Sequence, residues 1–556
     1  MRSRNKHLKW LLPLWIAAAL LVTAGWYASA QDDTTATAPA PAAAQPAGQP
    51  GAGTTPPALQ TSPEVVENAQ AAESGIQQDS QPTSTATAGE IAQRARDEAM
   101  GTPLQKATSL LGLLVFTALA WLLSVNRRAV DWRLVAWGIG LQFIFAVLIL
   151  WTAPGKAFFA GANDVFNALI GYTVEGAKFL FGNLVWNNVP VGPGGGFGPM
   201  DPVGTTTGWA AAGGFFAFNV LPTIIFFSSL TTLLYYLGVM EKVVKGFGWV
   251  MLRTMKISGA ESLSTAGNIF LGQTEAPLLV KPFISTMTRS ELHCIMVGGF
   301  GTVAGGVLAA YVGILVAYFP DIAGHLISAS VMAAPACIVV SKLMYPETEE
   351  PVTKGTLKIK LEKIDANAVD AAARGASEGL TLALNVGAML IAFIALVALL
   401  NGLLALSGDT LNDVIVWLGA RVGADWGRIA FLDDFTLQTI LGWLGAPLAW
   451  LMGVPWQDAP AVGTLIGEKT ALNEFVAYLH LGGMLSGGEN LDPRSVMIAT
   501  YALCGFANFS SIAIQIGGIG GMAPERRGDL SRLGLRAMIA GTLANFMTAC
   551  IVGILR

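Results

Sequence analysis

Apolar runs of about 20 residues recur along most of this chain, and they constrain its fold more than any other feature. A helix of that length crosses the hydrocarbon core of a bilayer. Charged residues make up 13% of the 556 residues and mean hydropathy is +0.54, whereas soluble domains carry about 25% charged residues. The composition excludes an ordinary cytosolic enzyme, a disordered regulator and a nucleic-acid binder. It predicts a polytopic membrane protein.

Hydropathy predicts about eight membrane spans. They are expected at 106–125, 134–152, 209–237, 295–319, 325–344, 380–404, 496–517 and 533–554. Basic residues gather in alternate loops, as at Arg127 and Arg128 after the first run and at Arg526 and Arg527 before the last. Because Lys and Arg stay cytoplasmic, this pattern predicts a multi-pass protein of a bacterial inner membrane with both termini periplasmic.

The N-terminal 30 residues have the pattern of a signal peptide. Basic residues precede an apolar run that ends in Ala28-Ser29-Ala30, which a signal peptidase accepts. We expect cleavage before Gln31, with an uncleaved anchor as the alternative. Residues 31–104 are rich in Ala, Pro, Thr and Gln. Such a segment cannot bury enough apolar surface to fold, so we expect a disordered periplasmic tail.

Two further segments, 261–287 and about 455–483, are apolar overall but interrupted by polar and charged residues. Broken backbone at membrane depth is tolerated only where it is buried in protein or lines a wet cavity, so we expect two re-entrant hairpins. Each hairpin precedes a span that is itself interrupted by Gly and polar residues. Two such pairs in opposite orientation predict an inverted repeat, which is the sequence pattern of a transporter's binding site.

Glu275 and Glu474 lie in the two expected hairpins. A carboxylate near the bilayer midplane costs about 3 kcal/mol or more and is normally retained for a partner or a pathway. With the amides and hydroxyls beside them, these carboxylates could bind a neutral polar solute. The alternative is a buried salt bridge between each glutamate and the nearby Lys281 or Lys469.

A cation site is a second prediction from the first hairpin. Asn268 lies roughly one helical turn before Gly272. Its amide oxygen, carbonyls freed where the hairpin breaks, and the hydroxyl of Thr302 would make an all-oxygen shell, which suits a hard monovalent cation. A helix-packing role for Asn268 is the alternative.

Three motifs together resemble those of the concentrative nucleoside transporters. They are Gly272-Gln273-Thr274-Glu275-Ala276-Pro277-Leu278, Asn473-Glu474-Phe475-Val476-Ala477-Tyr478 and Cys504-Gly505-Phe506-Ala507-Asn508-Phe509. The resemblance implies a transporter domain over 105–556, with an all-α polytopic fold of about eight spans, two re-entrant hairpins in an inverted repeat, and interfacial helices.

The resemblance also implies a function. It implies a homotrimeric symporter that imports nucleosides by alternating access, with no enzymatic activity and no organic cofactor. Sodium is favoured as the coupling ion because both oxygen-bearing side chains of the expected cation shell are present. Proton coupling is the alternative, and a channel or a membrane-embedded enzyme fits less well.

Site residues follow from the same resemblance, position by position. Residues that would face the nucleobase are Gln273, Thr274, Glu275 and Val307. Residues that would bind or pack against the ribose are Glu474, Phe506, Asn508 and Ser511. Residues that match the sodium positions are Asn268, Leu271, Thr302 and Val303, of which the two apolar ones would act through backbone carbonyls.

Overall fold

A computed structural model describes residues 101–185, 188–191, 208–211, 216–355, 365–422, 427–433, 435–488 and 491–556. All of them lie in the unit Ala86–Arg556. The signal peptide expected at 1–30 and most of the tail expected at 31–104 lie outside the described residues.

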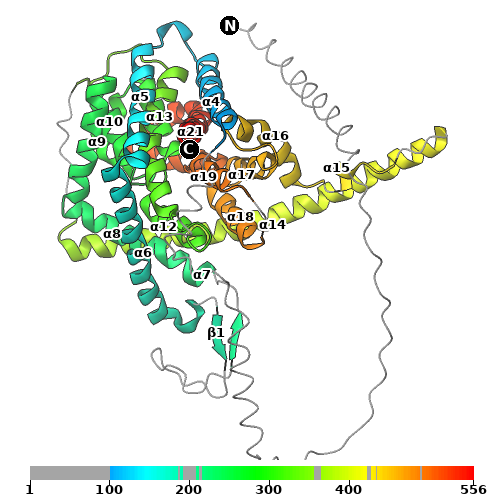
Figure 1. Ribbon diagram of the computed structural model, residues 1–556. Coiled ribbons are helices and arrows are strands. Elements are labelled where there is room, and N and C mark those ends of the chain that lie inside the picture. Colours follow the sequence, from blue (N-terminus) through cyan, green and yellow to red (C-terminus); the bar gives the residue numbers. More distant parts are fainter. Residues whose placement is uncertain are drawn as a thin grey trace, which may run out of the picture. The chain divides into compact units, whose positions relative to one another are not determined.

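Helices make up almost all of the described chain (Figure 1). The first ten are α4 Pro103–Leu122, α5 Trp132–Trp151, α6 Ala153–Phe181, α7 Phe216–Asn219, α8 Leu221–Tyr236, α9 Val239–Met255, α10 Gly259–Gly267, α11 Arg289–Gly301, α12 Gly305–Leu315 and α13 Ile322–Met344. The others are α14 Ala368–Val422, α15 Ala430–Asp433, α16 Leu437–Leu451, α17 Ala459–Ala471, α18 Glu474–Ser486, α19 Pro493–Leu503, α20 Phe509–Met522 and α21 Arg527–Leu555. The predicted all-α membrane class is confirmed.

Short non-α elements complete the described chain. The 3₁₀ helices are η1 Arg127–Ala129, η2 Gly182–Val185, η3 Ala276–Thr286 and η4 Pro524–Arg526. Strands β1 Asn188–Val191 and β2 Gly208–Ala211 pair antiparallel, with Asn188 opposite Ala211. Strand β2 therefore occupies the start of the span expected at 209–237, where the long helix begins only at Leu221. Pro222 lies in the first turn of that helix, where its missing N–H costs nothing.

Span number is the main difference between expectation and structure. Six described helices are long and apolar enough to cross a membrane, or seven if the bent pair α8 and α9 is one span. That pair bends by 79° at Gly238, whose φ is 74°. The span expected at 496–517 is two short helices, α19 and α20, and the span expected at 380–404 is part of the 55-residue helix α14.

Helix α14 begins beside α8 and then runs past the other helices (Figure 1). Small residues allow the close crossing with α8, because a Cβ at Gly375 would lie 2.6 Å from Thr232 Oγ1 and one at Gly379 would lie 2.8 Å from Ile225 Cα. Little of the most apolar stretch of α14 is buried. Its exposed apolar side chains include Leu384, Ile391, Ile394, Leu396, Leu399, Leu403 and Leu406.

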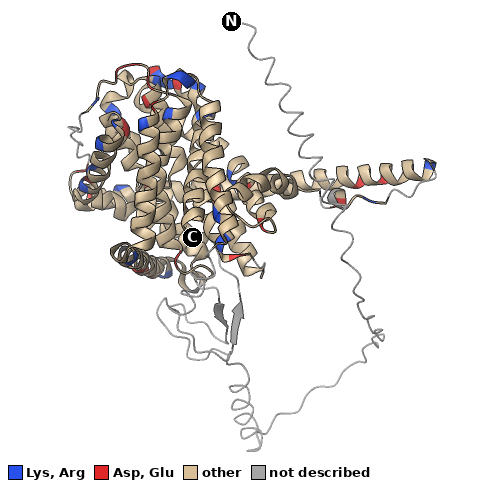
Figure 2. Ribbon diagram, turned by 45° about the horizontal axis from the view of Figure 1, so that its top comes forward, with Lys and Arg blue, Asp and Glu red and all other residues tan. Residues whose placement is uncertain are grey.

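The loops that carry the basic residues share one end of the helical bundle. Val125 N donates to Met344 O (3.0 Å), and Arg536 Nη1 donates to Leu123 O (2.6 Å). Figure 2 shows Lys and Arg gathered toward this end. The start of α4 and the end of α21 meet elsewhere, where Gly101 N donates to Arg556 O (2.8 Å).

Candidate functional site

The first predicted hairpin is formed by α10 and η3, which pack side by side. Ser258 caps α10 together with Glu261, and the helix ends at Asn268. The turn is closed by Glu275, whose Oε2 accepts a hydrogen bond from Gly272 N (2.6 Å). A Cβ at Gly272 would lie 2.9 Å from that oxygen, so a larger residue there would displace the Glu275 carboxylate. Glu275 thus binds this backbone amide, and Lys281 is exposed.

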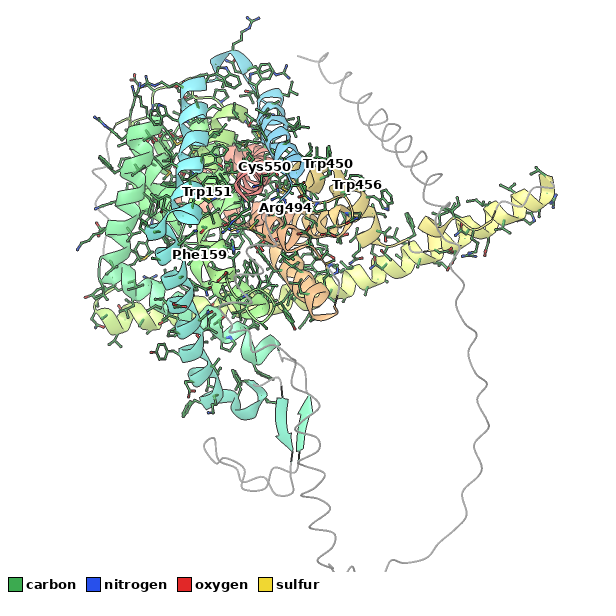
Figure 3. All side chains as sticks on the ribbon, viewed as in Figure 1. Trp151, Phe159, Trp450, Trp456, Arg494 and Cys550 are labelled. Carbon is green, nitrogen blue, oxygen red and sulfur yellow. The ribbon has the colours of Figure 1, made fainter. Side chains whose placement is uncertain are left out.

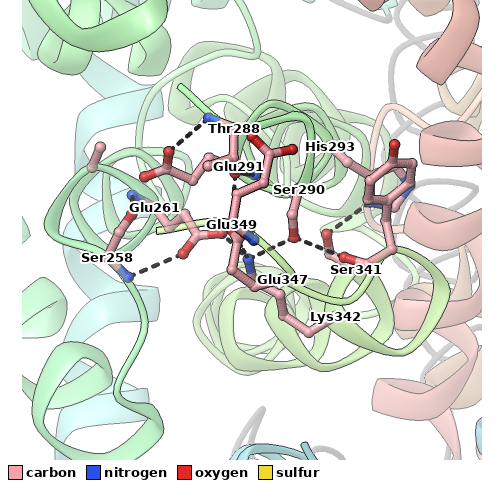
Figure 4. Close-up of polar contacts among 12 residues, drawn as sticks. Ser258, Glu261, Thr288, Ser290, Glu291, His293, Ser341, Lys342, Glu347 and Glu349 are labelled. Atoms are coloured by element: carbon pink, nitrogen blue, oxygen red, sulfur yellow. Dashed lines mark hydrogen bonds and ion pairs between the residues drawn. The ribbon is translucent and has the colours of Figure 1, made fainter. Parts of the chain in front are cut away.

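A buried polar network anchors the base of this hairpin (Figure 4). Lys342 Nζ, near the end of α13, lies 2.5 Å from Glu261 Oε1 and 3.2 Å from Glu347 Oε2, and it donates to Ser290 Oγ (2.8 Å). Glu261 belongs to the first turn of α10 and Ser290 to that of α11. Lys342 therefore joins the hairpin, the following half-helix and α13, and its removal would leave buried carboxylates unpaired.

Helices α17 and α18 form the second predicted hairpin. Asn473 lies between them and caps α18, because its Oδ1 accepts a hydrogen bond from Val476 N (2.9 Å). Glu474 is the first residue of α18 and is 4% exposed. The positive end of the helix dipole therefore stabilises its carboxylate.

Both spans that follow the hairpins are broken, as their sequences predicted. Helix α11 ends at Gly301 and α12 begins at Gly305, while α19 ends at Leu503 and α20 begins at Phe509. Gly505, in the second break, has a φ of 140°, and a Cβ there would lie 2.7 Å from Phe300 O. The two breaks are therefore in direct contact, and only glycine fits between them.

A chain of hydrogen bonds joins the two hairpins through the start of α20. Gln273 Nε2 donates to Ser511 Oγ (3.1 Å), and Ser511 N donates to Asn508 Oδ1 (2.8 Å). Asn508 Nδ2 donates to Glu474 Oε2 (2.9 Å). All four side chains are at most 7% exposed. The structure thus brings together four residues predicted from sequence segments more than 200 positions apart.

Two residues of this site were missed by the sequence reasoning. Tyr311 donates its hydroxyl hydrogen to Glu474 Oε1 (2.9 Å), and Gln515 Nε2 donates to Gln273 Oε1 (3.0 Å). Helical spacing was the available signal, since Tyr311 follows the predicted Val307 by four residues and Gln515 follows the predicted Ser511 by four.

The other predicted substrate residues surround this chain. Thr274 packs against α20, since a Cβ at Gly518 would lie 2.7 Å from Thr274 Cγ2. Val307 is buried on α12, one turn before Tyr311, and Phe506 is half-buried in the α19–α20 break. Glu275 is exposed at the hairpin turn.

The turn of the first hairpin lies against the α11–α12 break. Phe270 O accepts a hydrogen bond from Gly305 N (3.0 Å), which places Leu271 beside the break that contains Thr302 and Val303. The Thr302 hydroxyl donates to Gly298 O of its own helix (2.8 Å), so its oxygen retains acceptor capacity. The four predicted cation residues therefore come from two adjoining segments.

Asn268 carries the strongest polar signal in this region. It is fully buried, and neither Oδ1 nor Nδ2 has a hydrogen-bond partner within the described part of the chain. A Cβ at Gly298 would lie 3.1 Å from Asn268 Nδ2, so the carboxamide faces α11 one turn before Thr302. A buried carboxamide oxygen without a protein partner is suited to a cation.

Three family models match consecutive parts of the chain. They are Na+ dependent nucleoside transporter N-terminus at residues 111–184, Nucleoside recognition at 217–318 and Na+ dependent nucleoside transporter C-terminus at 325–553. Solved structures of CNTnw match as well. One in an inward-facing substrate-bound state is 41% identical with a TM-score of 0.67, over 81% of this chain and 97% of that one. A doubly substituted form in an outward-facing state, also 41% identical, has a TM-score of 0.69, over 82% and 98%.

Several sequences that are similar to this chain are named as transporters. An uncharacterized transporter of Haemophilus influenzae is 45% identical over 450 residues, which cover 80% of this chain and 97% of the relative. Solute carrier family 28 member 3 and sodium/nucleoside cotransporter 1 of Mus musculus are 41% and 40% identical, each over 81% of this chain. The matches cover 59% and 64% of these two relatives, so the chain spans about three fifths of their length.

Proposed function

Since this chain belongs to the concentrative nucleoside transporter family, whose members are transporters and not enzymes, we propose that it couples nucleoside uptake to sodium. The observation that carries the proposal is the buried hydrogen-bond chain from Gln273 through Ser511 and Asn508 to Glu474. Buried polar groups at the meeting point of two hairpins are what a neutral polar solute requires.

Recognition of ribose is assigned to the second hairpin and α20. The Glu474 carboxylate accepts hydrogen bonds, the Asn508 NH₂ group donates them, and Ser511 can do both. Vicinal hydroxyls of a ribose offer the complementary donors and acceptors, and Phe506 would pack near the sugar. The nucleobase is assigned to the opposite end, where the residues are Gln273, Thr274, Glu275 and Val307.

Sodium binding is assigned to the first hairpin and the α11–α12 break. The orphaned carboxamide of Asn268 supports this assignment, and Thr302 adds a hydroxyl oxygen. Backbone carbonyls of Leu271 and Val303 would complete an oxygen shell of the type that hard cations prefer.

Alternating access around this site is the proposed mechanism. Cation binding would order the first hairpin, and the nucleoside would then bridge both hairpins, so that the loaded domain moves across the scaffold.

We also propose a homotrimer in a bacterial inner membrane, with both termini periplasmic. The long apolar stretch of α14 that stays exposed in the single chain supports an intersubunit contact. Native mass measurement of the detergent-purified protein, with and without a cross-linker, tests the trimer. A monomer at all concentrations would exclude it.

The proposed function is tested by uridine uptake into vesicles that contain the purified protein. We expect uridine uptake against its concentration gradient. This uptake should stop when sodium is replaced by choline, and a pH gradient should not restore it. Uptake driven by a pH gradient alone would show proton coupling. In the same assay Glu474→Gln should lower uptake at least tenfold, because a buried charge-assisted hydrogen bond is lost. Unchanged uptake in this variant would exclude the site assignment.

A further inference from the structure

Gln515 is a fully buried residue of α20 to which the proposed site assigns no role. Its Nε2 donates to two acceptors, Met296 O on α11 (3.2 Å) and Gln273 Oε1 at the turn of the first hairpin (3.0 Å). A backbone carbonyl can only accept a hydrogen bond, so the NH₂ group of Gln515 must face Met296. The orientation of this carboxamide is therefore fixed by the backbone.

The fixed orientation of Gln515 determines that of Gln273. The second hydrogen of Gln515 Nε2 points at Gln273, so the Gln273 oxygen must face Gln515. Gln273 Nε2 then faces the opposite way and donates one hydrogen to Ser511 Oγ (3.1 Å). Its other hydrogen remains for a ligand, and Gln273 meets that ligand as a donor.

The other end of the chain is fixed in the same way. Asn508 Oδ1 accepts from Ser511 N, which can only donate, so the Asn508 NH₂ group must face Glu474. Both carboxamides in the site are thus oriented by the main chain. Gly299 of α11 provides the space for the glutamine pair, because a Cβ there would lie 2.8 Å from Gln515 Nε2 and 2.9 Å from Gln273 Cβ.

We propose that Gln515 is a positioning residue that makes Gln273 a hydrogen-bond donor to the nucleobase and so gives the site a preference for keto bases. Uridine and inosine present a carbonyl oxygen where cytidine and adenosine present an amino group. An amino group opposite the Gln273 NH₂ group leaves two buried donors unpaired, which is costly. The inference rests on the proposed assignment of Gln273 to the base end of a nucleoside site.

Vmax/KM ratios in vesicles that contain the full chain test the inference. The keto-to-amino ratio is the Vmax/KM of uridine divided by that of cytidine, and the Vmax/KM of inosine divided by that of adenosine. If only one of these pairs is transported, the ratio for that pair decides the test. We expect the unsubstituted protein to prefer the keto base about five- to tenfold, the value of one hydrogen bond. Gln515→Met, which cannot orient Gln273, should bring the ratio close to one.

Gln515→Glu gives a second, directional result. A carboxylate cannot donate to Gln273 Oε1, so Gln273 should rotate its NH₂ group toward residue 515 and present its oxygen to the base. The keto-to-amino ratio should then fall below one. If the glutamate variant does not fold, the methionine variant decides.

Gln142→Met is the matched control, since Gln142 is also a fully buried glutamine but donates only to Gly138 O of its own helix α5 (3.4 Å). Its keto-to-amino ratio should match that of the unsubstituted protein. The uridine to 2′-deoxyuridine ratio, which reports the ribose end, should also stay unchanged in this control.

Two results would overturn the inference while leaving the proposed function intact. One is nucleoside uptake by the unsubstituted protein with a keto-to-amino ratio of one. The other is an unchanged ratio, within about twofold, in the Gln515 variants. Absence of nucleoside uptake by the unsubstituted protein under both sodium and pH gradients would instead contradict the proposed function.

Discussion

Lys469 Nζ lies 2.9 Å from Asn545 Oδ1, and together these two side chains bind the carbonyls left free at both helix breaks. Lys469 also donates to Ala502 O at the end of α19 (2.9 Å), and Asn545 Nδ2 donates to Gly301 O at the end of α11 (2.7 Å). A cation at the C-terminal end of a half-helix is stabilised by the helix dipole. Lys469 thus binds oxygens at the breaks, whereas Glu474 accepts hydrogen bonds from Tyr311 and Asn508. These hydrogen bonds take the place of the salt bridge that was considered between Lys469 and Glu474.

Removal of this lysine should destabilise the fold. Lys469→Met leaves Ala502 O and Asn545 Oδ1 buried without a donor, and each such loss costs about 1–3 kcal/mol. We expect a clear drop in the thermal midpoint, measured by size-exclusion chromatography of heated, detergent-solubilised protein. Lys354→Met is the control, because that side chain is 65% exposed and should have no effect. Equal midpoints for the two variants would contradict the role of Lys469.

Tyr311 should contribute to substrate affinity through Glu474. Tyr311→Phe removes the hydroxyl that donates to Glu474 Oε1 but keeps the ring, which stacks on Tyr478 at 4.3 Å between centroids. We expect the KM for uridine to rise about fivefold or more, since a hydrogen bond to a charged acceptor is worth about 1.5–3 kcal/mol. Sodium dependence should not change. Tyr318→Phe, at an exposed tyrosine, should behave like the unsubstituted protein, and a variant at 311 with the original KM would disprove the contribution.

Asn268 should set the sodium requirement of transport. Asn268→Ala removes a carboxamide that has no hydrogen-bond partner among the described residues, so no hydrogen bond within that part of the protein is lost. We expect the sodium concentration for half-maximal uptake to rise about tenfold or more, as for loss of one ligand to a cation. Ser328→Ala is the comparison, because that hydroxyl donates to Gly324 O of its own helix (2.7 Å). A sodium curve at position 268 that matches this comparison would exclude Asn268 as a ligand.

Sequence patterns predicted the local breaks but not the contacts between them. Both hairpins and both broken spans could be located because Gly, Pro and polar residues interrupt apolar runs there. The far end of α14 could not be located, because hydropathy falls near Gly408 and Asp409 and predicts that the apolar run ends there. The helix nevertheless continues, since neither residue breaks it and the Asp409 side chain stays exposed. Tyr311 and Gln515 were missed because each gains its role from a partner more than 160 positions away.

Arg494 offers a final test of how the helix ends are joined. This arginine lies within the bundle near Cys550 (Figure 3) and is 1% exposed. Its Nε donates to Gly453 O just after α16 (3.1 Å), and its Nη2 donates to Gly553 O near the end of α21 (2.6 Å). The C-terminal dipoles of two helices therefore compensate a buried charge that has no carboxylate within bonding distance among the described residues.

Arg494→Leu should leave both carbonyls unpaired and lower the thermal midpoint at least as much as the lysine variant above, because two acceptors are again buried without donors. Arg494→Lys should recover only part of the loss, since a single ammonium group cannot reach both carbonyls as the forked guanidinium group does. The control is Arg253→Lys, at an exposed arginine near the end of α9, for which we expect a change within about 0.5 kcal/mol. Full recovery by lysine at 494 would show that charge alone, and not the two-carbonyl geometry, stabilises this junction.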